Sequence, residues 1–190
     1  MRQTIEDLEE LYLGRGIEAR LLFNGPSLQG HWMTWTPPGY RGAPVYVGMN
    51  RTFLGNPDWH GPDPHYLVVC DPRRPTNPHV AKHPGLINGA ASGPDVGIRI
   101  GRSTEDTPFS FDLIRGYVGP TTGFVALQVA VWMGFKEIHC HGLDLKGTHF
   151  DWRGDVRQDD MEAQADMTRE AIPLLRDRGV TLHYHGLWRP

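Results

Sequence analysis

The chain has 190 residues, enough for one domain with a substantial buried core, and its 39% apolar content is typical of a globular protein. A formal net charge of -3 leaves no overall basic surface, so general nucleic-acid binding is not indicated. The N-terminus is polar and acidic and no apolar run reaches the length of a membrane span, so we expect neither a signal peptide nor a membrane helix.

In the first half of the chain, short apolar runs alternate with loops. Residues 4–14 begin with capping and acidic residues and end at glycines, which predicts a short helix. Apolar runs that stop at Gly, Asn, Asp or Pro predict strands, which we place at 19–23, 45–49, 66–70 and 96–100. The segment 72–95 is rich in Pro, Gly, Asn and His and is predicted to be a long loop over the site.

The second half is more regular. An apolar helix is predicted over 122–133, opened by Thr121 or Thr122, and an amphipathic helix over 159–178. Strands are predicted at 138–141 and 180–184, and a polar loop over the site at 145–158. Strands alternating with helices indicate one α/β domain, residues 1–190, with a mostly parallel sheet and helices on both faces.

The two cysteines, Cys70 and Cys140, lie in apolar, strand-like runs. This placement predicts buried thiols and no disulfide framework. Because such thiols are typical of a reducing compartment, we expect a cytoplasmic protein.

Small or polar residues follow four of the predicted strands: Asn24-Gly25-Pro26-Ser27, Asn50, Asp71 and Gly142-Leu143-Asp144. The carboxyl ends of parallel strands meet at one edge of a sheet, so these residues could converge on one crevice. Thr121-Thr122-Gly123 opens a helix, whose N–H groups and dipole favour an anion such as phosphate. Each segment alone is also compatible with an ordinary turn, but together they predict a nucleotide-like ligand.

The motif Asn24-Gly25-Pro26-Ser27-Leu28 resembles the opening motif of bacterial Rossmann-like sialyltransferases and of a related group that includes archaeal 6-hydroxymethylpterin pyrophosphokinase. Further segments are similar to sialyltransferase motifs: Asn50, Thr121-Thr122-Gly123 and Gly134-Phe135-Lys136-Glu137-Ile138 with Gly142-Leu143-Asp144. The resemblance covers about two-thirds of the chain. It implies a Rossmann-like fold that binds a nucleotide at its strand ends.

With this resemblance, the expected function is a glycosyltransferase-like enzyme that uses a nucleotide or nucleotide-sugar donor and an acceptor that the sequence does not identify. The residues assigned to nucleotide binding are Asn24, Gly25, Ser27, Asn50, Asp71, Thr121, Thr122, Gly123, Gly142 and Asp144.

Three departures from the sialyltransferase pattern change the expected chemistry. Asp71 replaces an asparagine, so a preference for cytosine is not implied. Two phosphate-binding tyrosines are missing, and Lys146 and His149 are predicted to bind phosphate instead. The family's catalytic histidine is also missing, which leaves His149 or Asp160 as the predicted base.

Two other functions stay open. In a pyrophosphokinase-like reaction, Asp71 and Asp144 would hold Mg²⁺ on ATP or GTP. Alternatively, the protein could bind a nucleotide without catalysis. No cofactor besides Mg²⁺ is expected, and a second subunit of a homo-oligomer could complete the site.

Histidines also alternate along two predicted strands, His139 with His141 and His183 with His185. If the strands were neighbours, the four imidazoles could share a face and bind zinc. Since that pairing is not visible in the sequence, polar positions at sheet edges are the favoured interpretation.

Overall fold

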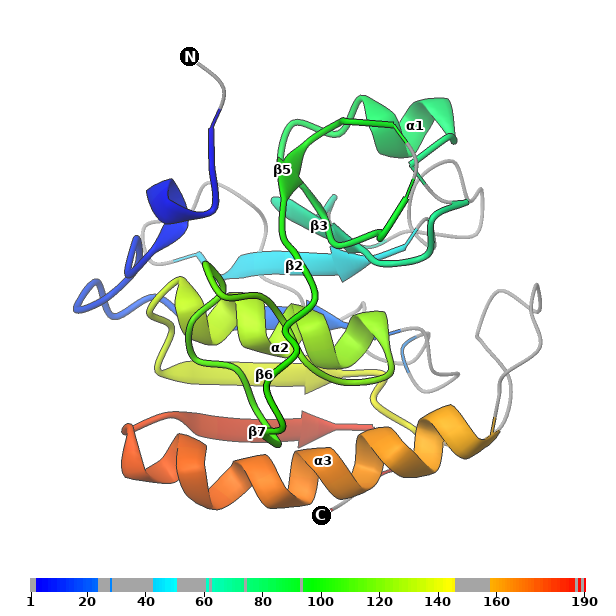
Figure 1. Cartoon of the computed structure of the whole chain (residues 1–190). Helices are drawn as coiled ribbons and strands as arrows, with labels where there is room; N and C mark the ends of the chain where they lie inside the picture. The colour runs from blue at the N-terminus through cyan, green and yellow to red at the C-terminus, as the bar shows by residue number, and fades with distance from the viewer. Residues whose placement is uncertain are drawn as a thin grey trace.

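A computed structural model describes residues 3–23, 28, 43–50, 61, 63–73, 75–92, 94–145, 158–186, 188 and 190, the first three residues of the last helix by their backbone alone. Within this part of the chain, seven strands form one sheet in the order β5-β4-β3-β2-β1-β6-β7 (Figure 1). Every neighbouring pair is parallel. The predicted Rossmann-like α/β fold is therefore confirmed.

The strands are β1 Ala19–Leu22, β2 Val45–Met49, β3 Tyr66–Val69, β4 Leu86–Asn88, β5 Ile98–Arg99, β6 Glu137–His141 and β7 Thr181–His185. The helices are the 3-10 helix η1 Glu6–Leu8 and the α-helices α1 Pro78–Ala81, α2 Thr122–Trp132 and α3 Gln158–Asp177. In the described residues, no helix is both long and apolar enough to cross a membrane.

The sheet has two different faces because side chains alternate along each strand. One face contributes Leu21, Val47 and Ile138 to a large core that also contains the buried apolar residues of α2 and α3. On the other face, Leu67 and Val69 of β3 pack against α1. Helices therefore cover both faces, as the alternation of strands and helices predicted.

The predicted helix over residues 4–14 is wrong, since only η1 forms there and turns follow it. The Glu10 N–H donates to the Trp132 carbonyl (2.9 Å), and the Tyr12 N–H donates to the Met133 carbonyl (2.8 Å). These bonds satisfy carbonyls at the end of α2, which an α-helix leaves without partners. A tertiary contact thus replaces the local helix.

The prediction of a continuous loop over 72–95 is also wrong, because this segment contains α1 and β4. Asn77 caps α1 by accepting a hydrogen bond from the His79 N–H (2.9 Å). β4 pairs with β3 in parallel register. A three-residue strand among prolines and glycines carries little local signal, so pairing with β3 decides its conformation.

We expect His83 to make the fold sensitive to acid. Its Nδ1 accepts from the Gly85 N–H (3.2 Å), its Nε2 lies 3.0 Å from the Pro64 carbonyl oxygen, and burial lowers its pKa. The pKa of His83 in the folded protein lies below its value of about 6.5 in the unfolded chain. The contribution of neutral His83 to stability is therefore complete above that pH and is lost as the pH drops toward the folded pKa. Urea unfolding at pH 7.5 and 5.5 measures this loss, which is below about 1.4 kcal/mol per pH unit for one proton.

The control is His83→Asn, which keeps an acceptor near the Gly85 N–H and cannot take up a proton in this range. Its stability should depend less steeply on pH than that of the parent. An identical pH slope in both proteins would contradict the prediction.

Candidate functional site

The sheet reverses its strand order at β1. β2 follows β1 in the chain and pairs with one side of it, whereas β6, which comes after β5, pairs with the other side. The crevice outside the carboxyl ends of strands at such a switch point is where open α/β sheets bind ligands. The two segments that leave this point begin at Phe23 and Gly142, and they carry the Asn-Gly-Pro-Ser and Gly-Leu-Asp motifs.

The structure brings α2 and β2 together at the same edge. The Thr122 hydroxyl donates to Oδ1 of Asn50 at 3.4 Å, although the two residues are far apart in sequence. Asn50 has a φ of 60°, a left-handed conformation that asparagine tolerates better than most residues. The sharp turn at the end of β2 thus directs a side-chain amide toward the first turn of α2.

Thr121 and Gly123 shape the start of α2. The Thr121 hydroxyl accepts from the Phe124 N–H at 3.2 Å and donates to Oε1 of Gln164 on α3, which confirms the predicted N-cap. A Cβ at Gly123 would lie 2.8 Å from the Phe23 ring, so glycine allows α2 to approach the end of β1. The helix dipole is therefore directed at the switch point.

Gly142 and Asp144 lie in tightly packed backbone after β6. Gly142 has a φ of 73°, and a Cβ there would meet the Phe23 carbonyl oxygen at 2.6 Å. The side chain of Asp144 is 2% exposed, and its Oδ1 would lie 2.9 Å from a Cβ at Gly186. The ends of β1, β6 and β7 thus pack closely around a buried carboxylate.

Asp71 follows β3, which β2 and β1 separate from β6. Its carboxylate accepts from the Arg73 backbone N–H (2.9 Å) and pairs with the Arg73 guanidinium (3.0 Å). β2 and β1 lie between the strands that precede Asp71 and Asp144, so β3 and β6 are three interstrand steps, about 14 Å, apart. A shared Mg²⁺ would need both carboxylates about 2.1 Å from the ion, so the segments after β3 and β6 would have to bring them together.

The sequence motifs did not assign Cys70 or Tyr117 to the site, but Cys70 lies beside Thr122 and Tyr117 lies beside Cys70. Cys70 follows β3 and interacts with Thr122 and Tyr117, while burial raises its pKa to about 12. The Tyr117 hydroxyl donates to the Gly89 carbonyl at 2.9 Å. Cys70 and Cys140 are free thiols, as predicted, and the raised pKa keeps Cys70 protonated at neutral pH. The position of Cys70 next to Asp71 at a strand end was the available sequence signal.

Several predicted site residues lie outside the described residues: Asn24, Gly25, Ser27, Lys146 and His149. Asp160 lies in the first turn of α3, where the structure describes the backbone alone. The predicted roles of these residues in phosphate binding and as a base therefore stay predictions.

No protein-family model matches the chain, and a search of curated proteins also finds no match. A functional proposal therefore depends on the geometry of this edge and on the motif resemblance.

Proposed function

We propose that this protein binds a nucleotide at the carboxyl edge of β3, β2, β1 and β6 and transfers a glycosyl group from a nucleotide-activated donor. The observation that carries the proposal is the convergence of α2 with the end of β2 beside the switch point, through the bond between Thr122 and Asn50. The similarity of the strand-end motifs to those of bacterial sialyltransferases supports the same chemistry.

The arrangement suits an anionic leaving group. The first turn of an α-helix carries N–H groups without intrahelical acceptors and a partial positive charge, both of which stabilise phosphate. In the transfer, the bond between the sugar and the phosphate oxygen breaks and the acceptor oxygen bonds to the sugar carbon. The acceptor's proton passes to a base, either His149 or Asp160, and Lys146 offsets the charge on the leaving phosphate. If Asp160 is the base, His149 can bind the phosphate together with Lys146.

The spacing of the strands before the two acids favours this reaction over a pyrophosphokinase reaction. A shared Mg²⁺ requires both carboxylates at one ion, whereas the strands that precede the two acids are about 14 Å apart in the sheet. We therefore expect nucleotide binding to persist when divalent ions are chelated.

Asn50→Gly and Thr122→Val test the site. Glycine accepts the left-handed φ of Asn50, and valine has nearly the shape of threonine, so each change removes a polar group with little backbone strain. Loss of a hydrogen bond to a charged ligand should lower the affinity for the best-binding nucleotide about tenfold or more. Calorimetry with CMP, UDP, GDP, ATP and GTP measures the affinity of each variant.

The matched control is Thr104→Val, which makes the same change at an exposed position outside the site. Its nucleotide affinity should equal that of the parent. Equal affinity in all variants would contradict the nucleotide site, and binding that is abolished by EDTA would favour the pyrophosphokinase reaction. A bound nucleotide sugar that is neither transferred nor hydrolysed would indicate a binding protein without catalysis.

A further inference from the structure

The pairing that the histidine pattern required is present. β6 and β7 are parallel neighbours, with His139 opposite His183 and His141 opposite His185. Ile138 and Cys140, which alternate with these histidines on β6, belong to the core on the other face of the sheet. The four imidazoles therefore gather on one face of two adjacent strands.

The rings are close enough to share a ligand. The His139 and His183 rings stack with centroids 4.3 Å apart, and those of His141 and His185 are 4.5 Å apart. Nδ1 of His139 lies 2.8 Å from Nε2 of His185. One ring nitrogen from each of His139, His141 and His185 lies within 4.8 Å of the other two.

These distances are near those of a metal site. A Zn–N bond of about 2.0–2.1 Å places two nitrogens of a tetrahedral site about 3.3 Å apart. The pair His139–His185 would need to separate by about half an ångström, which small side-chain rotations provide. His141, whose ring nitrogen lies within 4.8 Å of the other two, would need to move closer by up to about 1.5 Å to complete a three-histidine set. The fourth position is then open to water.

A carboxylate contacts one of these histidines. Oε2 of Glu18 is 3.3 Å from Nε2 of His139, and Oε1 of the same residue bonds to Arg20. This carboxylate favours the tautomer of His139 with its proton on Nε2 and its lone pair on Nδ1, toward His185. Metal-binding histidines commonly have such a carboxylate partner, which orients the ring and strengthens the ligand.

Charge gives a second reason for a metal. The ring centroids of His139, His141 and His185 lie 4.5–6.3 Å apart, so protonating more than one of these imidazoles would bring like charges close together. Two carboxylates, Glu18 and Glu137, lie at the border of the cluster.

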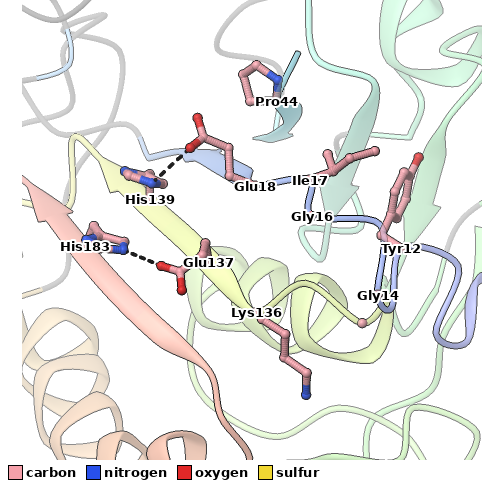
Figure 2. A pocket seen from close by; sticks show the side chains of 11 residues that line it. Tyr12, Gly14, Gly16, Ile17, Glu18, Pro44, Lys136, Glu137, His139 and His183 are labelled. Atoms are coloured by element: carbon pink, nitrogen blue, oxygen red, sulfur yellow. Dashed lines mark hydrogen bonds and ion pairs between the residues drawn. The ribbon is translucent and has the colours of Figure 1, made fainter. Parts of the chain in front are cut away.

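One of the three proposed ligands, His139, lines a cavity. This cavity of about 650 Å³ lies at the amino-terminal end of β6 and is lined by Glu18, Glu137, His139 and His183, among others. Figure 2 shows Glu18 beside His139 and Glu137 beside His183, with the 2.7 Å contact of the second pair. Two carboxylates at the mouth of this cavity would attract a cation.

We propose that His139, His141 and His185 form a binding site for one divalent transition metal ion, of which Zn²⁺ is the best match. This site lies on the sheet face opposite α2 and does not depend on the nucleotide proposal. Imidazole ligands suit zinc, and three protein ligands leave one position for water or another molecule.

The test uses the full-length chain without a polyhistidine tag, freed of metal by a chelator and titrated with Zn²⁺ by calorimetry in the absence of nucleotide. The parent should bind one ion per chain. His139→Gln and His185→Gln should each weaken binding by more than about 100-fold, and Glu18→Gln by about 10–100-fold, the range for carboxylates behind a ligand. His79→Gln, at an exposed histidine of α1, is the matched control and should bind like the parent.

The spectrum of the Co²⁺-loaded parent gives a measurement that does not need a folded variant. It should show the visible bands of a four- or five-coordinate site without a thiolate charge-transfer band. A thiolate band would mean that Cys70 or Cys140 binds the ion and would overturn the proposal. It would also be overturned if the parent bound no ion, or if folded His139→Gln and His185→Gln bound Zn²⁺ as tightly as the parent.

Discussion

Gln128→Leu is expected to destabilise the protein by about 3–5 kcal/mol, because it leaves several buried backbone groups without partners. Gln128 is fully buried in α2. Its Oε1 accepts from the Val118 N–H (3.0 Å) and the Ser110 N–H (3.3 Å), and its Nε2 donates to the Val118 carbonyl (2.8 Å). One side chain thus supplies three hydrogen bonds to the segment that leads into α2.

Leucine has a similar volume, so the loss should come from polar groups and not from a cavity. Denaturation in urea measures this loss. It is large, because the total free energy of unfolding of a native domain is only about 5–15 kcal/mol. The control is Gln3→Leu, the same change at an exposed position, which should stay within about 0.5 kcal/mol of the parent. A loss for Gln128→Leu as small as that of the control would contradict the prediction.

Gly142→Ala is expected to lower the free energy of unfolding by about 2–5 kcal/mol. Its φ of 73° disfavours a side chain by about 1–2 kcal/mol, and overpacking typically adds about 1–3 kcal/mol. The new methyl group would meet the Phe23 carbonyl oxygen at 2.6 Å and Cβ of Leu28 at 2.8 Å. The ends of β1 and β6 would have to move apart.

Gly179→Ala separates the two contributions. Gly179 has a φ of 70°, and a Cβ there would meet nothing within 4 Å, so this variant reports the backbone strain alone. Urea denaturation of both variants should show the larger loss for Gly142→Ala. Equal losses would show that the strand ends accommodate the methyl group without cost.

Much of the fold could be predicted from local patterns. The run Val45–Met49 forms β2 with the predicted bounds, and Thr121 caps α2 as its sequence indicates. Such elements are predictable because apolar residues with β-branched side chains, and a capping hydroxyl before an apolar helix, stabilise their conformation within a few residues. Elements that depend on distant partners could not be predicted in this way. Residues 9–14 bond to the end of α2, and β4 forms by pairing with β3.

The candidate site, too, could be predicted only in part from local patterns. Local sequence patterns indicated which residues follow the strands, among them Asn50, Asp71 and Asp144, because small and polar residues end buried apolar runs. These patterns did not determine the distances between the residues, since strand order is set by packing between segments far apart in the chain. Only the tertiary structure placed β6 beside both β1 and β7. That one arrangement creates the switch point, separates the strands that precede Asp71 and Asp144 and brings the histidines of two strands into contact.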